Sequence, residues 1–474
     1  MIGGGATGLG VAVDAASRGY RTLLFEAEDF GCGTSSRSTK LIHGGVRYLR
    51  QGNLRLVHDA LRERAILLRN APDFVQEIPF VVPARGSLDF AKLVFGFSLY
   101  DFLAGSRGLA KSRRLSKDEA LARVPALRVE GLRGGVLYHD ARFDDARLAI
   151  QLARTAVREG ATLINGTAVR AIEHSGAEAP RVVVRDRESS REIEVAARVV
   201  VNAAGPSVDA VRRLADPNRS RMLAPSRGSH LVLDRAAFPG DAALLIPDVG
   251  DGRVVFLIPW GDRVLLGTTD VAVAPDGGEP SASRAEMEQL LALAARVLER
   301  PPAIADVRSV FAGLRPLLRG EGSTASLPRD HVVRVEDTLV TIAGGKWTTY
   351  RLMAEAAVDH AAAVGELPAR PCRTATLPIE PMRAPQGATP LDAHTDVTRE
   401  QVERAAREEM ARTVEDVLAR RTGTLPRDAR LALRLAPAVA GILAKELGRD
   451  ADWERGEVER FERVAARSLP ETLC

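Results

Sequence analysis

A glycine-rich turn at the very start of the chain constrains the fold more than any other feature. Gly3, Gly5 and Gly8 precede residues 6–18, whose apolar side chains recur with helical spacing. The first glycine permits a tight turn, the second lets backbone approach a pyrophosphate, and the third lets the helix pack close to a strand. An apolar strand then ends at Glu26, about 20 residues after the turn, where a ribose hydroxyl would need an acceptor. The pattern predicts a nucleotide-cofactor layer; the alternative is an ordinary βα turn with a chance acid.

The strand that should lead into this turn is short. Only Met1 and Ile2 precede Gly3, whereas strands usually need about five residues. We therefore expect that the first strand is truncated or its start misassigned, and that a completed apolar strand would strengthen cofactor binding.

Composition limits the class of protein. The 474 residues, 45% hydrophobic and 27% charged, predict a globular chain of two or three domains. The net charge of +4 comes from dispersed arginines, and no basic block indicates nucleic acid. Cys32, Cys372 and Cys474 lie far apart, so they predict neither a metal site nor a disulfide framework and fit a reducing cytoplasm. Cys32 stands beside the cofactor turn, where a packed thiol is favoured over a redox role.

The longest apolar stretch, residues 93–103, is too short to span a bilayer. Four basic residues follow it: Arg107, Lys111, Arg113 and Arg114. Such a stretch could lie on an anionic membrane surface, or it could be a helix packed over the active site. The two interpretations are compatible.

The rest of the chain alternates between helical and strand patterns. Ser283 and Glu286 form a capping box for one predicted helix. The predicted helices are 145–158 and 284–300, and the predicted strands are 162–164, 181–185, 191–195, 198–202, 231–233, 243–246, 254–258, 264–267, 310–315 and 338–343. The block 229–270, with turns at 250–252 and 261–262, predicts an antiparallel sheet separate from the nucleotide layer.

A second glycine turn, at Gly344 and Gly345, opens another predicted helix with Lys346 and Trp347. Two such turns far apart in sequence suit a long cofactor held at both ends. A helix N-terminus at the pyrimidine edge of a flavin would stabilise the negative charge that appears on reduction, which a nicotinamide enzyme would not need. The pattern favours FAD over NAD.

Several long motifs, in order, resemble the FAD-dependent glycerol-3-phosphate dehydrogenases. The motifs are residues 3–8, 33–49, 138–148, 202–206, 258–270, 313–317, 344–351 and 413–422. The resemblance implies an α/β fold: a Rossmann-like FAD-binding domain (1–75, 140–225 and 305–365), an antiparallel, amino-acid-oxidase-like substrate or cap domain (76–139 and 226–304), a Pro-rich linker (366–390) and a C-terminal α-helical domain (391–474). The chain departs from the family at Asp73, where many members carry histidine, and it lacks a calcium-loop spacing.

The resemblance also implies an activity, the oxidation of sn-glycerol 3-phosphate to glycerone phosphate with electrons passed to a respiratory quinone. The alternatives are a glycerol-3-phosphate oxidase that uses oxygen, a related amine or amino-acid oxidase, and a flavin-binding protein that has lost catalysis. The expected location is the cytoplasm or the inner face of the cytoplasmic membrane. The oligomeric state stays open, with a homodimer as one option.

The candidate site residues follow from this chemistry. His43 is the favoured proton acceptor, because an unperturbed imidazole titrates near neutral pH; His230 is its competitor, and Lys346 could polarise the alcohol or bind phosphate. Arg47 and Arg315 are candidate phosphate clamps, with Tyr48 as a substrate contact. The candidate FAD-binding residues are Gly3, Gly5, Ala6, Thr7, Gly8, Glu26, Thr34, Ser35, Ser36, Ser38, Thr39, Lys40, His43, Gly44, Gly45, Val169, Ala203, Gly205, Gly345, Lys346, Trp347 and Thr348. No metal site is expected.

Overall fold

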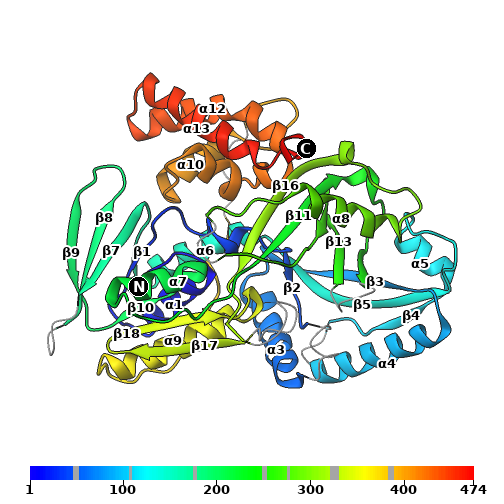
Figure 1. Cartoon of the computed structure of the whole chain (residues 1–474), viewed down its shortest axis with the longest axis horizontal. Coiled ribbons are helices and arrows are strands. Elements are labelled where there is room, and N and C mark those ends of the chain that lie inside the picture. The colour runs from blue at the N-terminus through cyan, green and yellow to red at the C-terminus, as the bar shows by residue number, and fades with distance from the viewer. Residues whose placement is uncertain are drawn as a thin grey trace.

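The computed structural model describes residues 1–45, 53–105, 109–173, 179–247, 254–274, 278–320, 330–382 and 389–473. Figure 1 shows an α/β layer on one side, a large sheet with its own helices on the other, and a helical C-terminal region packed above both. The predicted turn at 250–252 and the basic residue Arg107 lie outside the described residues.

The α/β layer is assembled from segments far apart in sequence. Leu23–Phe25 pairs in parallel with Thr162–Ile164. Val200–Asn202 pairs in parallel with residues 339–341. Ile2 lies between them, bridged in parallel to both Phe25 and Asn202. The elements are α1 (Ala6–Ser17), β1 (Leu23–Phe25), α6 (Asp145–Arg158), β6 (Thr162–Ile164), β10 (Val200–Asn202), η3 (Gly205–Ser207), α7 (Val208–Ala215), β17 (His331–Glu336), β18 (Leu339–Gly344), η6 (Trp347–Thr349) and α9 (Tyr350–Val364). The antiparallel sheet β7 (Thr167–Glu173), β8 (Arg181–Asp186) and β9 (Glu192–Ala196) flanks this layer, and β8 and β9 correspond to the predicted strands 181–185 and 191–195.

The large sheet has the strand order β15-β11-β14-β13-β12-β3-β5-β2, with β16 against β11 and β4 against β5. Its strands are β2 (Leu41–Ile42), β3 (Val75–Ala84), β4 (Arg113–Leu115), β5 (Gly134–Phe143), β11 (Ser226–Asp234), β12 (Ala243–Pro247), β13 (Val254–Trp260), β14 (Arg263–Gly267), β15 (Val271–Ala272) and β16 (Val307–Arg315). Within the predicted block 229–270 the strands pair antiparallel, as expected, and β3 joins this block at its edge by pairing in parallel with β12 at Ala243 and Phe80. The chain between these strands crosses the α/β layer, so no hairpin fixes their direction.

Helices cover the large sheet and the passage between the two layers. They are α3 (Leu54–Asn70), α4 (Ser87–Ala104), α5 (Lys117–Arg123) and α8 (Arg284–Ala295), together with the short turns η1 (Thr34–Ser36), η4 (Arg235–Ala237) and η5 (Ile304–Asp306). The capping box of Ser283 and Glu286 is present at α8. This helix ends at Ala295 and not at Arg300, because the following residues turn so that Leu298 bridges to Leu127.

The C-terminal region has its own hydrophobic core, which includes Val417, Leu435 and Phe461. Its elements are α10 (Arg399–Glu408), the π-helical turn η7 (Asp416–Arg421), α11 (Thr424–Arg427), α12 (Ala429–Leu447), α13 (Ala451–Ala466) and η8 (Pro470–Leu473). Among the described residues, no helix has the length and apolar character needed to cross a bilayer.

Candidate active site

The first glycine turn forms an open cradle at the N-terminus of α1. Gly3 has φ of +103°, a conformation that favours glycine, and a Cβ at Gly8 would overlap the Gly3 carbonyl oxygen. Gly5 is the N-cap of the helix and has no side chain of its own to bond the first N–H groups, of which that of Ala6 is bonded by Ser35. Backbone donors and the positive end of the helix dipole at such a place bind phosphate. The turn therefore fits a cofactor pyrophosphate.

Glu26 lies at the end of β1, beside this cradle. Its carboxylate accepts the backbone N–H of Gly4 at 2.5 Å and that of Glu28 at 2.9 Å. Burial raises the pKa of Glu26 to about 7, although the Gly4 N–H opposes that shift. The binding of a ribose by this carboxylate stays a prediction. Ala203 lies against the same turn, since a Cβ at Gly3 would contact the carbonyl oxygen of Ala203. Val169 packs against the neighbouring hydrophobic core, which contains Phe25.

Ser35 joins the two glycine turns. Its hydroxyl accepts the backbone N–H of Ala6 at 2.8 Å, and its carbonyl accepts the indole N–H of Trp347 at 2.8 Å. Ala6 begins α1, and Trp347 begins the short turn that leads into α9. One residue thus ties together the two places at which a long cofactor is expected to be held.

A cavity of about 320 Å³ opens beside the second glycine turn. The predicted site residues on its wall are Thr34, Ser38, Thr39, His43, Gly45, His230, Arg315, Gly345, Lys346, Trp347 and Thr348. Phe80, Phe97 and Phe256 belong to its apolar side. Arg47 and Tyr48 lie outside the described residues. The fold thus gathers residues from four distant motifs around one chamber.

Arg315 is held at the wall of this cavity by backbone and side-chain oxygens. Its guanidinium donates to the hydroxyl of Thr268 at 3.1 Å and to the carbonyl of Thr269 at 3.0 Å. A carboxylate oxygen of Asp270 lies 3.6 Å from the other terminal nitrogen. The side chain of Arg315 keeps 21% of its surface exposed. Such a cation, fixed in direction, suits recognition of an anionic substrate group.

His230 is buried and uncharged. Burial, with the nearby charges of Arg315 and Lys40, holds its pKa well below the usual 6.5. Its Nε2 lies 2.9 Å from the hydroxyl of Thr39, and its ring stacks on Phe311 at 4.8 Å between centroids. In the described chain, Nδ1 has no hydrogen-bond partner. His230 therefore presents a neutral imidazole to the cavity and is a weak base.

Lys40, Ser38 and Thr34, all predicted to bind the cofactor, direct their side chains at protein atoms. Lys40, at φ of +58°, places its ammonium against Asp145 and the carbonyl of Ser36. The Ser38 hydroxyl donates to Asp145 at 2.7 Å, and the Thr34 hydroxyl donates to the carbonyl of Leu314 at 2.6 Å. These contacts shape the loop. Their role in binding FAD stays a prediction.

Comparisons with known proteins place the chain in a family. Residues 1–359 match the family model described as FAD dependent oxidoreductase. The chain belongs to this family. Residues 372–454 of this flavoprotein match a second model, described as the C-terminal domain of alpha-glycerophosphate oxidase. The predictions of FAD as cofactor and of the fold class are thereby confirmed.

Its relatives narrow the family to a branch. A mitochondrial glycerol-3-phosphate dehydrogenase of Arabidopsis thaliana is 42% identical over 397 residues, covering 80% of this chain and 63% of the relative. Glycerol-3-phosphate dehydrogenase 2 of Mycobacterium bovis is 41% identical over 374 residues, covering 78% and 63%. The glycerol-3-phosphate dehydrogenase of Bacillus halodurans, solved with FAD, superposes with a TM-score of 0.78 at 28% identity, covering 99% of this chain and 94% of that one. The predicted resemblance is confirmed, and the chain spans less than two thirds of the length of the two sequence relatives.

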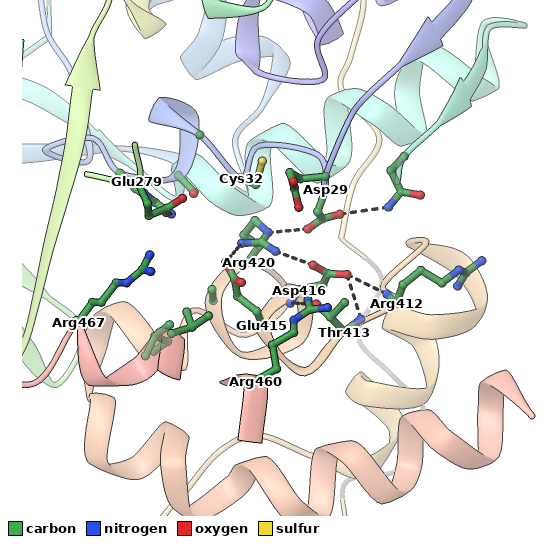
Figure 2. A pocket seen from close by; sticks show the side chains of 18 of the residues that line it. Asp29, Cys32, Glu279, Arg412, Thr413, Glu415, Asp416, Arg420, Arg460 and Arg467 are labelled. Atoms are coloured by element: carbon green, nitrogen blue, oxygen red, sulfur yellow. Dashed lines mark hydrogen bonds and ion pairs between the residues drawn. The ribbon is translucent and has the colours of Figure 1, made fainter. Parts of the chain in front are cut away.

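A second, larger cavity of about 960 Å³ lies between the FAD layer and the C-terminal region of this oxidoreductase. Figure 2 shows Arg420 between Asp29 and Asp416, bonded to both carboxylates. Arg420 also donates to Glu415 at 3.1 Å, and Arg421 donates to Asp29 at 2.9 Å. Asp29 belongs to the loop between Glu26 and Ser35, so the C-terminal region supports the cofactor loop.

Cys32 lines this second cavity. Its Sγ lies 3.9 Å from a carboxylate oxygen of Glu26. Burial raises the pKa of the Cys32 thiol to about 12, so it stays protonated at neutral pH. This agrees with a packed thiol.

Sequence reasoning missed the residues that act through long-range contacts. Asp145 organises the loop around Lys40 and Ser38, and Tyr100 meets the backbone of Gly44. Asp145 lies in the motif 138–148, which carries the family resemblance. The motif indicated that Asp145 matters, but it did not indicate that Lys40 is its partner. Tyr100 lies in the apolar stretch 93–103, where nothing marked its hydroxyl.

Proposed function

We propose that the chain oxidises sn-glycerol 3-phosphate to glycerone phosphate with FAD as the hydride acceptor. The observation that carries the proposal is the position of Arg315, a guanidinium fixed at the wall of the same cavity as His43, His230 and Lys346. The names of the relatives agree with this substrate. A cation fixed beside proton-transfer groups suits an alcohol that carries a phosphate.

The glycine turns and Glu26 fit FAD as described above. In our proposal, the first turn, Ala203 and Gly205 hold the pyrophosphate and adenosine half, and residues 34–45 with 345–348 hold the flavin half. FAD, when bound, supplies the group that accepts hydride from C2 of the alcohol. The Lys346 ammonium and the N-terminal turn before α9 would stabilise the negative charge that the flavin gains on reduction.

The chain's own residues prepare the alcohol for this transfer. His43 accepts the hydroxyl proton, and Arg315 holds the phosphate, aided on sequence grounds by Arg47 and Tyr48. His230, neutral in its buried position, orients the substrate through the nitrogen that Thr39 does not occupy. The apolar wall keeps water from the reacting atoms and strengthens each charged contact.

We further propose that electrons pass to a quinone at a membrane surface. Helix α4 turns Phe97 and Tyr100 inward, whereas Phe95 and Phe102 are 74% and 80% exposed. Exposed aromatic side chains near basic residues suit shallow insertion among anionic lipids. The cytoplasmic face of such a membrane is the proposed location.

An oxidase that passes electrons to oxygen is the second candidate. The C-terminal family model carries the description of an alpha-glycerophosphate oxidase, which favours this alternative. The structural likenesses to glycine oxidases, at 20% identity or less, support the fold alone.

An anaerobic titration tests the proposed substrate. Glycerol 3-phosphate should bleach the flavin absorbance of the purified protein rapidly, glycerol far more slowly, and glycine not at all. A protein that holds flavin but shows no bleaching with glycerol 3-phosphate would contradict the proposal and favour a binding protein without catalysis.

The acceptor is tested separately. We expect the protein to float with anionic vesicles in a salt-sensitive way, and a Phe95→Ser, Phe102→Ser variant to lose this flotation. We also expect a soluble quinone to reoxidise the reduced flavin faster than oxygen does. Absence of flotation together with faster reoxidation by oxygen would favour the oxidase.

A further inference from the structure

The peptide unit between His43 and Gly44 is held at both of its polar ends. The hydroxyl of Thr348 donates to the His43 carbonyl at 3.4 Å, and the Gly44 N–H donates to the phenolic oxygen of Tyr100 at 3.0 Å. The carbonyl and the N–H belong to one rigid plane. Two hydroxyls, from η6 and from α4, therefore restrain the plane that follows His43.

The Tyr100 hydroxyl is itself directed. Its proton is donated to Asp140 at 3.0 Å, and the other oxygen of Asp140 accepts from Arg64 at 2.7 Å. Tyr100, Asp140 and Arg64 are each at most 2% exposed. Because the phenol proton points at the carboxylate, the oxygen is left to accept from Gly44.

Packing prevents Tyr100 from moving away. Its ring lies edge-on to Phe97 at 6.4 Å and to Tyr138 at 6.5 Å, measured between ring centroids. A Cβ at position 44 would overlap the Tyr100 oxygen and the Leu61 side chain, so the contact requires glycine. Burial, with the charge of Asp140, also raises the pKa of Tyr100 well above its usual value, and the phenol stays neutral.

We propose that Tyr100, supported by Asp140 and Arg64, is a positioning residue for His43. It acts through the Gly44 N–H, which fixes the peptide plane and hence the direction in which the His43 side chain leaves the backbone. The inference rests on the proposed function for the part played by His43 as proton acceptor. The contact itself is independent of that role.

The variant Tyr100→Phe in the full FAD-loaded chain tests this inference. Small displacements of a reacting group are costly, so the rate of flavin reduction at saturating glycerol 3-phosphate should fall about 10- to 100-fold. KM for glycerol 3-phosphate and flavin content should change less than about twofold, since the phosphate clamp is untouched. Hydrogen exchange of the Gly44 amide, followed by mass spectrometry, should become about tenfold faster.

The control is Tyr20→Phe, which also removes one hydroxyl. Tyr20 donates to the carbonyl of Pro368 at 2.6 Å on the exposed side of the FAD layer. This variant should leave both flavin reduction and Gly44 exchange unchanged.

The outcomes separate the inference from the proposed function. If wild-type flavin is reduced by glycerol 3-phosphate but Tyr100→Phe matches it in rate, or leaves Gly44 exchange unchanged, the inference is overturned. If wild-type flavin is not reduced at all, the proposed function fails and takes the catalytic part of the inference with it, while Gly44 exchange still decides whether Tyr100 holds the plane. If Tyr100→Phe does not fold, rapid exchange of Gly44 in the wild-type protein would overturn the contact.

Discussion

The cavity beside the second glycine turn and the cavity below the C-terminal region use charge in opposite ways. In the cavity below the C-terminal region, Arg420 is bonded to three carboxylates, and Arg449 and Arg187 at its rim face Glu188 and Glu28. In the cavity beside the second glycine turn, the walls are mostly apolar and the charged groups are few. The larger and more charged cavity has its charges matched to one another. In the smaller one, His230 is buried against Phe311, with the cations Arg315 and Lys40 nearby.

The difference separates a structural charge network from a reactive site. A buried cation with satisfied carboxylate partners mainly fixes one arrangement of the chain. In an apolar cavity, burial instead shifts the pKa of an ionisable group. His230 is neutral because its pKa is held well below 6.5. Shifted pKa values occur in both cavities, since burial also raises that of Cys32; the smaller cavity differs in placing a neutral imidazole and a fixed guanidinium on one apolar wall.

The largest expected loss of activity is for His43→Asn. Removing a general base typically costs about 10²- to 10⁴-fold, so the rate of flavin reduction should fall by that factor. His230→Asn should lose much less, because a histidine held neutral by burial is a weak base. Stopped-flow reduction under anaerobic conditions measures both. The reverse order of losses would transfer the base to His230.

The next effect concerns stability. Arg420→Ala removes the guanidinium that pairs with the buried carboxylates of Asp29 and Asp416. Because this leaves buried charge without that partner, the free energy of unfolding should fall by about 3–5 kcal/mol. The matched control is Arg449→Ala, whose partner Glu188 is 55% exposed and whose loss should cost about 0–1 kcal/mol. Denaturant unfolding of the FAD-loaded protein measures both. Similar losses in the two variants would contradict the distinction between buried and rim pairs.

Arg315→Ala should reduce kcat/KM for glycerol 3-phosphate by roughly 10- to 200-fold, the loss of one charge-assisted contact of about 1.5–3 kcal/mol. The much poorer turnover of glycerol should barely change, because glycerol has no phosphate. Arg467→Ala, at the wall of the other cavity, should leave both reactions unaltered. Equal losses on the two substrates would assign Arg315 to the flavin or the fold.

The smallest effect is on pH dependence. Glu26 has a pKa of about 7 in the folded protein without cofactor, against an ordinary value of 4.5. Its contribution to the stability of that form is present below about pH 4.5 and is lost as pH rises through about 7.

FAD affinity should move in the opposite direction, because an ionised carboxylate accepts the ribose hydroxyls better. From pH 6 to pH 8, Kd for FAD should fall about tenfold and level off above pH 7. Fluorescence titration of the apoprotein measures the change, and Glu26→Gln should abolish it. The same pH slope in that variant would show that another group titrates.

Local features of the site could be predicted, and distant pairings could not. The first glycine turn, Glu26 and the capping box at Ser283 are encoded within a few residues, and the structure has all three. The parallel pairing of β12 with β3 joins Phe80 to Ala243, 163 residues later in the chain, and no short-range signal encodes it.

The same limit explains the polar residues. Lys40 was expected at the cofactor because its neighbours are, but Asp145, which neutralises it, comes 105 residues later. Tyr100 stood in an apolar stretch whose inward and outward faces could not be told apart without the fold. The partner of its hydroxyl, Gly44, is 56 residues away.

Because Ser35 is attached at two places, the number of residues between Ser35 and His43 sets the distance between the two ends of the proposed cofactor site. Ser35 is fixed to α1 through Ala6 and to the second glycine turn through Trp347, while the carbonyl of His43 is fixed to Thr348. If one residue were added to or deleted from this stretch, the residues proposed to hold the phosphate end and those proposed to hold the flavin end could not both keep their positions. The spacing between these anchor points, more than the identity of each residue in the segment, is what an engineer of this protein must preserve.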